Sequence, residues 1–442
     1  MKKSARDTAL SVLTACRKEG AWSDGSLKNA IKNNGLDARD AALATHICYG
    51  VLQNRNLLDF YISHYCTQKA EKLQPTVLDI LRIGAYQMIF MDKIPSNAAV
   101  NEAVEMTKRS ECKKAFGLVN AVLRKIAANK DNLPPIPSDS KVDYLALKYS
   151  HPKWLVERLV GILGQEAEEY LAACNAPVPM TAQVNTLQAK REELLAELHR
   201  ENICAEPHPY LDSAFTVTGS GNLEELDAFL RGDFTVQDTA SRLAVLAADP
   251  KAGEKVLDCC AAPGGKSFAA AMLMGNEGSI ISCDIHPHKL KLIENGAKRL
   301  GIDIIETALA DGKVQREDFV GAFDTVICDV PCSGLGIIRK KPDVRYKDPV
   351  ALKGLPNIQK AILENVSSYV KPGGTLLYST CTILPEENEE VTEGFLASHS
   401  EFTKEIFTLP GVGEVWGQVT LWPQRYGTDG FYICKMRRNE KG

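Results

Sequence analysis

The chain has 442 residues, more than one hydrophobic core usually supports, so we expect two or three domains. Its 45% hydrophobic and 24% charged residues are typical of a folded protein and exclude a largely disordered one. Charged residues interrupt the N-terminal segment where a signal peptide needs its apolar core, and no apolar run has membrane-spanning length, so we expect a cytoplasmic protein without membrane association.

The net charge of −4 is unevenly distributed along the chain. Residues 1–130 contain 20 Lys and Arg against 12 Asp and Glu, whereas the remaining residues contain 32 against 44. A basic front part predicts contact with a polyanion, although a solvated basic face is the alternative.

The front of the chain, residues 4–130, has the apolar spacing of helices, as in Ala9, Val12, Leu13 and Cys16. We predict an all-α domain over residues 1–130. The segment KDNLPPIPSDS (130–140) is typical of a linker. Two helical stretches (143–174) follow, then the short strands AQVNT and FTVTG around the helix REELLAELHR, which together predict a small α+β module over 141–235.

Beyond Asp233 strands alternate with helices, which indicates a parallel α/β sheet and a Rossmann-like domain over 236–440. Short apolar strands are predicted at 255–259, 279–283, 323–329 and 375–380. Ligands of such sheets lie beyond the carboxyl ends of the strands. The residues that follow each strand are therefore candidate site residues.

The first of these strands leads into a turn rich in Ala and Gly, with the sequence Cys260–Ala261–Ala262–Pro263–Gly264–Gly265–Lys266. Small residues let a ligand approach the backbone, and the helix that follows directs its amides at that space. This predicts a nucleotide-like ligand. A phosphate loop is excluded because Cys260 occupies a position that requires glycine, and the dinucleotide fingerprint G-x-G-x-x-G is absent.

Acids and thiols follow the other strands. Asp284 ends the second strand, where a carboxylate can accept hydrogen bonds from ribose hydroxyls, and Asp311 lies where the next strand should end. An acid in a loop can also simply form a turn. Asp329 and Cys332 follow the third strand and Cys381 follows the fourth, so one carboxylate and two thiols should converge.

The thirteen cysteines are scattered through the chain, which favours reduced thiols over a disulfide framework. Zinc is a weaker alternative, because no second C-x-x-C or His pair stands at ligand spacing. We therefore expect no metal.

The motifs DCCAAPGGK, DVPCSG, YSTC and TDGF resemble those of RNA cytosine-5 methyltransferases, over about residues 143–438. The helical front is similar to the NusB-like RNA-binding domain in ILRIGAYQMIF, IPSNAAVNEAVEMTKR and FGLVNAVLRKI. The combination resembles the bacterial members that act on small-subunit ribosomal RNA.

The resemblance implies methyl transfer from S-adenosyl-L-methionine to C5 of a cytosine in RNA, with 16S rRNA as the expected partner and a monomer as the expected state. Cys381 would be the nucleophile, Cys332 would assist product release, and Asp329 and Lys266 would stabilise charge on the base. The cofactor would contact the residues Cys260, Ala261, Ala262, Pro263, Gly264, Gly265, Lys266, Asp284, Asp311 and Asp329.

Several alternatives remain at this point. DNA cytosine-5 enzymes use the cysteine that corresponds to Cys332 and lack a counterpart of Cys381, which favours RNA. Transfer RNA as substrate, a small-molecule methyltransferase and a non-catalytic rRNA assembly factor are the others. The segment 339–347 places five cations around Tyr346, which predicts phosphate contacts at the rim of the site.

Overall fold

A computed structural model describes residues 3–19, 23–218 and 223–440. Packing divides the chain into two units. The helical unit comprises residues 1–176 and 338–347, and the sheet unit comprises 177–337 and 348–442. Among the described residues, no helix has both the length and the apolarity that a bilayer crossing requires.

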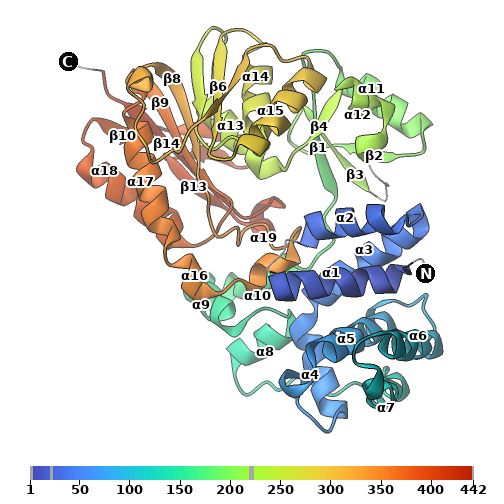
Figure 1. The fold of residues 1–442 in the computed structure, drawn as a ribbon. Coiled ribbons are helices and arrows are strands. Elements are labelled where there is room, and N and C mark those ends of the chain that lie inside the picture. The colour runs from blue at the N-terminus through green and yellow to red at the C-terminus, as the bar shows by residue number, and fades with distance from the viewer. Residues whose placement is uncertain (1–2, 20–22, 219–222, 441–442) are drawn as a thin grey trace. The chain divides into compact units, whose positions relative to one another are not determined.

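The helical unit confirms the helices predicted from apolar spacing (Figure 1). Three helices, rather than the predicted two, occupy residues 141–173. The α-helices are α1 (Ala5–Glu19), α2 (Ser23–Asn34), α3 (Ala38–Gln53), α4 (Arg55–Tyr65), α5 (Pro75–Phe90), α6 (Ser96–Arg109), α7 (Phe116–Ala128), α8 (Lys141–Lys148), α9 (Lys153–Leu163) and α10 (Ala167–Ala173). Short 3-10 helices are η1 (Ala70–Lys72), η2 (Lys113–Ala115), η3 (Gly164–Glu166) and η6 (Pro342–Tyr346).

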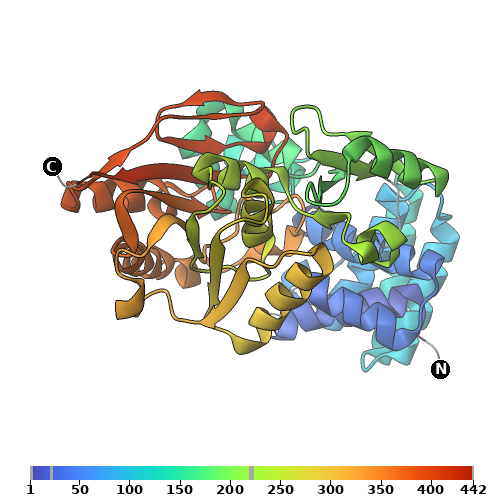
Figure 2. The same cartoon turned by 90° about the horizontal axis from the view of Figure 1, so that it is seen from above.

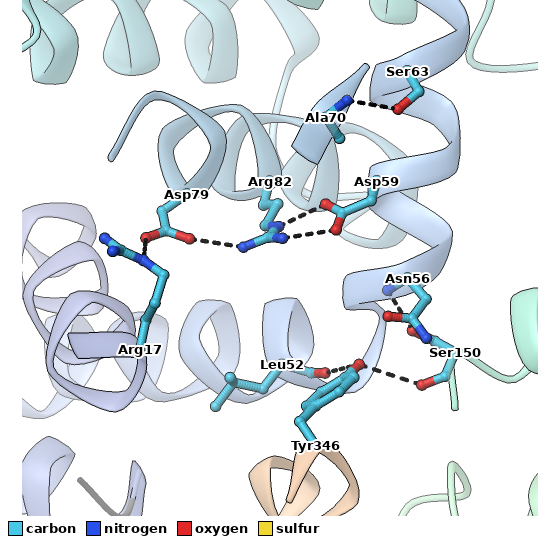
Figure 3. Close-up of polar contacts among 10 residues, drawn as sticks. All are labelled: Arg17, Leu52, Asn56, Asp59, Ser63, Ala70, Asp79, Arg82, Ser150 and Tyr346. Atoms are coloured by element: carbon cyan, nitrogen blue, oxygen red, sulfur yellow. Dashed lines mark hydrogen bonds and ion pairs between the residues drawn. The ribbon is translucent and has the colours of Figure 1, made fainter. Parts of the chain in front are cut away.

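Helix α5 lies at the centre of this unit and is apolar on nearly all sides, as expected of a buried helix. It also carries two buried charges. Arg82 forms two hydrogen bonds of 2.7 Å with Asp59 and one of 2.9 Å with Asp79, and Arg17 donates to Asp79 at 3.1 Å (Figure 3). Burial is tolerated because each charge has an opposite partner.

The segment Ile338–Lys347 leaves the sheet unit and packs within the helical unit. Arg345 is fully buried there and donates to the backbone carbonyls of Gln53, Tyr149 and Ser150 at 3.1–3.3 Å, and to Asn175 Oδ1 at 3.0 Å. The hydroxyl of Tyr346 donates to the carbonyl of Leu52 at 2.9 Å (Figure 3).

The prediction that five cations of this segment meet phosphate is therefore wrong for Arg345. Its guanidinium already donates to the backbone carbonyls of Gln53 and Ser150. The sequence shows the positive charge of Arg345 but contains no pattern that predicts the burial of its side chain.

The sheet unit begins with a four-stranded antiparallel sheet in the order β2-β3-β1-β4. The predicted strands and helix are confirmed, although Gly219, the last residue of FTVTG, lies outside the described residues. The elements are β1 (Met180–Val184), α11 (Arg191–Arg200), β2 (Cys204–Pro207), β3 (Ala214–Thr218), η4 (Leu223–Glu225), α12 (Asp227–Arg231) and β4 (Phe234–Val236).

A larger sheet follows in the order β10-β14-β9-β8-β5-β6-β7, with β13 beside β14. Strands β7, β6, β5, β8 and β9 are parallel, which confirms the predicted Rossmann-like fold, and the last strands of the chain add an antiparallel edge. The elements are α13 (Thr239–Ala248), β5 (Lys255–Asp258), α14 (Gly265–Leu273), β6 (Ser279–Asp284), α15 (Pro287–Leu300), β7 (Ile305–Leu309), η5 (Glu317–Phe319), β8 (Phe323–Asp329), α16 (Pro349–Leu352), α17 (Leu355–Ser367), β9 (Val370–Thr380), η7 (Pro385–Glu387), α18 (Glu389–Ser398), β10 (Phe402–Lys404), β11 (Phe407–Leu409), β12 (Gly413–Val415), β13 (Gln418–Leu421), α19 (Pro423–Tyr426) and β14 (Phe431–Arg438).

Both faces of the larger sheet are covered by helices, which explains why its central parallel strands β5 and β8 are largely buried. Successive residues of β5 enter different cores: Val256 packs with α13, α14 and α15, whereas Leu257 packs with α17 and α18. Figure 1 and the view from above in Figure 2 show these helices around the strands. The carboxyl ends of the strands remain available for a site.

The domain boundaries 1–130, 141–235 and 236–440 stay a prediction. Packing places α8, α9 and α10 with the helical unit, so the predicted α+β module is divided between the two units.

Candidate active site

The turn after β5 forms a ligand cavity at the carboxyl edge of the sheet. Gly264 has φ +107°, a conformation that favours glycine, and α14 begins at the next residue. A cavity of about 230 Å³ is lined by the turn and by the segment before α13, including Gln237, Asp238, Ala261, Ala262, Pro263 and Gly265. The predicted small-residue turn therefore does border open space.

Asp258 closes β5 and lines the same cavity, although it was not among the predicted site residues. Its Oδ2 accepts a hydrogen bond of 2.7 Å from Ser267, whose Oγ in turn accepts one of 2.8 Å from Ser282. Burial raises the pKa of Asp258 to about 6. These two hydrogen bonds thus hold the first turn of α14 against strands β5 and β6.

Lys266 and Asp329 form an ion pair at this edge, with Nζ and Oδ2 2.6 Å apart. Ser379 donates to the other carboxylate oxygen at 2.8 Å, and the Lys266 ammonium lies 5.2 Å from the centre of the Phe431 ring. Burial acts to lower the pKa of Lys266, but the charge of Asp329, its hydrogen bond and the charge of Asp258 together raise that pKa. The lysine is therefore held as an ammonium.

Cys332 and Cys381 meet at the same edge, as predicted, with their sulfur atoms 3.2 Å apart. Both side chains are partly exposed. The hydrogen bond from Cys332 lowers the pKa of Cys381, while the same contact raises the pKa of Cys332. The contact therefore makes Cys381 the more easily deprotonated thiol of the pair.

A buried polar frame holds the two thiol-bearing turns together. The amide of Gly336 donates to the carbonyl of Cys381 at 3.0 Å, and Gly430 of the TDGF motif donates to the carbonyl of Gly336 at 2.9 Å. A Cβ on Gly336 would lie 1.8 Å from the Gly430 carbonyl oxygen, so this close approach requires glycine.

Sequence reasoning missed two residues of this frame, Glu387 and Asn388. Buried Glu387 accepts hydrogen bonds of 2.8 Å from the Ser333 amide and from Gln359, and buried Asn388 accepts one of 2.6 Å from Thr380. They belong to the acidic run PEENEE, which looks like an exposed loop. Their position just after Cys381 was the available signal.

Asp284 and Asp311 end or follow β6 and β7, as predicted, but neither lines the 230 Å³ cavity. Asp284 is buried and its Oδ1 accepts from the amide of His286 at 2.9 Å. Asp311 accepts from the amide of Lys313 at 3.0 Å. Both acids shape turns, so their cofactor contacts stay a prediction.

The chemistry of the donor set fits S-adenosylmethionine. Carboxylates of Asp238, Asp258 and Asp329 suit its positive groups, the amino end of α14 suits its carboxylate, and small residues leave room for its bulk. Within the described residues, no three Asp, Glu, His or Cys side chains gather in a way that could hold a metal ion.

Comparison with known proteins gives three matching families. Residues 245–437 match the family described as 16S rRNA methyltransferase RsmB/F, residues 3–128 the NusB family, and residues 151–224 the RsmF/B-like ferredoxin-like domain. A Bacillus subtilis protein named probable ribosomal RNA small subunit methyltransferase B is 39% identical, with 99% of each chain covered.

Solved structures share the fold. The crystal structure of PH0851 is 29% identical, covers 100% of both chains and has a TM-score of 0.83. The structure of NSun6 from Pyrococcus horikoshii with SFG is 22% identical, covers 66% of this chain and 99% of its own, and has a TM-score of 0.57. The chain therefore belongs to the RsmB/F family of 16S rRNA methyltransferases and is an S-adenosylmethionine-dependent enzyme.

Proposed function

We propose that the protein methylates C5 of one cytosine in 16S rRNA through a covalent bond between Cys381 and C6 of that base. The observation that carries the proposal is the sulfur pair of Cys332 and Cys381, 3.2 Å apart, beside the Lys266–Asp329 ion pair. Bound S-adenosylmethionine supplies an electrophilic methyl group.

Cytosine C5 is too weak a nucleophile to accept a methyl group unaided. Addition of the Cys381 thiolate at C6 places enamine character on C5, which can then attack the methyl carbon. The lowered pKa of Cys381 supports this role, because the thiolate is the reactive form.

The ion pair of Lys266 and Asp329 would stabilise the base while the thiolate adds. As thiolate adds, negative charge develops on the ring at N3 and O2, and a permanently charged Lys266 ammonium would stabilise it. Asp329 anchors that ammonium and offers a carboxylate to the exocyclic amino group of cytosine.

Release requires transfer of the C5 proton to solvent and departure of Cys381 as a thiolate. We assign the hydrogen of this contact to Cys332, whose pKa is raised, so its S–H would stabilise the leaving thiolate. Removal of Cys332 should therefore leave attack possible and slow release.

We further propose RNA binding by the helical unit and a cytoplasmic location. The basic balance of residues 1–130 supports the first. All thirteen cysteines lie in described parts of the chain as thiols rather than disulfides, which supports the second. Transfer RNA as substrate is the competing possibility.

Bisulfite sequencing of 16S rRNA from a strain lacking the gene tests the proposal. One cytosine should lose its methyl signal and regain it when the wild-type gene, but not the Cys381→Ala variant, is restored. A loss confined to transfer RNA, or no loss at any cytosine, would contradict it.

A further inference from the structure

We propose that Cys332 and Cys381 form a reversible disulfide when the protein meets hydrogen peroxide, so that the thiol pair is also a site of oxidative modification. The two sulfur atoms lie 3.2 Å apart. A disulfide needs about 2.05 Å, so an approach of about 1.2 Å would suffice.

The backbone keeps the two sulfurs together. Strands β8 and β9 pair in parallel with Asp329 opposite Ser379, and one thiol follows each strand. The hydrogen bond from the Gly336 amide to the Cys381 carbonyl ties the turn of Cys332 to the end of β9. Each thiol is therefore held at a high effective concentration relative to the other.

Reactivity distinguishes Cys381 from the neighbouring thiols. Cys381, Cys332 and Cys260 are partly exposed, whereas Cys259 and Cys328 are buried. The contact with Cys332 lowers the pKa of Cys381, whereas the pKa values of Cys259, Cys260 and Cys328 are raised. Peroxide should therefore react first at Cys381.

The reaction balances with peroxide as the oxidant. The Cys381 thiolate attacks one peroxide oxygen, the O–O bond breaks, and sulfenic acid and hydroxide form; hydroxide takes up the proton of Cys332. The Cys332 thiolate then attacks the Cys381 sulfur, and the departing hydroxide is protonated to water. Two thiols lose two electrons, and one peroxide becomes two water molecules.

The disulfide would remove the nucleophile and also prevent irreversible oxidation of Cys381 to sulfinic acid. This consequence for activity rests on the proposed function. Disulfide formation itself does not, because it depends only on the two sulfurs.

The test treats the full-length protein with hydrogen peroxide, alkylates remaining thiols, and maps peptides by mass spectrometry. We expect a linked peptide pair containing Cys332 and Cys381, lighter by two hydrogens than the separate peptides, that dithiothreitol separates. A matched Cys204→Ser variant, which removes an exposed thiol elsewhere, should behave identically.

In Cys332→Ser, Cys381 should instead accumulate sulfinic acid that dithiothreitol does not reverse. Absence of the linked peptide in the wild type, or sulfinic acid at Cys381 while Cys332 stays alkylatable, would overturn the proposal. A linked peptide without any methyltransferase activity would leave it standing and contradict only the proposed function.

Discussion

At the scale of single residues, one contact makes two identical side chains unequal. The hydrogen bond between Cys332 and Cys381 lowers the pKa of Cys381 and raises that of Cys332. Neither residue type nor sequence spacing determines this difference. It depends on the 3.2 Å contact of the two sulfur atoms and, for Cys381, on the nearby charge of Lys266.

The first prediction concerns the pH dependence of Cys381. Removing the S–H donor in Cys332→Ala should raise the pKa of Cys381, so its alkylation by iodoacetamide should reach half its maximal rate at a higher pH than in the wild type. Cys332→Ser keeps a hydroxyl donor and should restore part of the shift. An unchanged pH profile in Cys332→Ala would show that the contact does not stabilise the thiolate.

A second prediction concerns Asp284, which we expect to bind the ribose of the cofactor. Asp284→Ala should weaken S-adenosylmethionine binding by about 1.5–3 kcal/mol, the range for charged hydrogen bonds. Because Asp284 also caps a turn through the His286 amide, Asp284→Asn serves as the control that keeps an acceptor there. Calorimetry showing unchanged affinity in the Ala variant would place the ribose elsewhere.

At the scale of elements, the sequence predicted the helices and strands that have a local pattern of apolar residues. The apolar periodicity of α5 and the short apolar strands β5, β6 and β8 are confirmed, because burial imposes those patterns residue by residue. The sequence analysis did not predict the antiparallel strands β10, β13 and β14, although the sequence of β14, FYICKMRR, is typical of a strand. The burial of Arg345 could not be predicted, because a charge buried by distant partners has no local signal, whereas the position of Glu387 just after Cys381 was a signal that was not used.

The segment Ile338–Lys347 leads to a third prediction. Arg345→Ala should lower the stability of the helical unit by roughly 2–4 kcal/mol, because a fully buried guanidinium with four hydrogen bonds is removed. Urea denaturation of the full chain, followed by hydrogen exchange in α3 and α8, measures the loss. Lys341→Ala removes a nearby cation and should change stability by less than about 0.5 kcal/mol. Equal effects of the two substitutions would contradict this role of Arg345.

At the scale of the whole molecule, chemistry and positive charge are carried by different parts of the chain. The reactive residues all lie in the sheet unit, whereas residues 1–130 carry the excess of cations. Helices α6 and α7 and the turn between them expose the α6–α7 basic patch, which comprises Lys108, Lys113, Lys114, Phe116 and Arg124. Exposed cations beside an aromatic ring suit an RNA strand.

A fourth prediction follows for this patch. Combining Lys113→Gln, Lys114→Gln and Arg124→Gln should weaken RNA binding and reduce the slope of log K against log salt by about 2, because fewer phosphates are neutralised. Binding titrations at several salt concentrations measure the slope, and cofactor affinity should not change. The matched control removes Lys190, Lys251 and Lys371 from the sheet unit. If both triple variants lose the same slope, the patch has no special role.

The most direct test of the account asks which thiol bonds to the RNA. Full-length Cys332→Ala, incubated with substrate rRNA and S-adenosylmethionine, should remain linked to RNA and migrate as a slower band on a denaturing gel. Cys381→Ala should give no such band and no methyl transfer, while still binding both ligands. A band from Cys381→Ala, together with its absence from Cys332→Ala, would reverse the roles and contradict the assignment of Cys381 as the nucleophile.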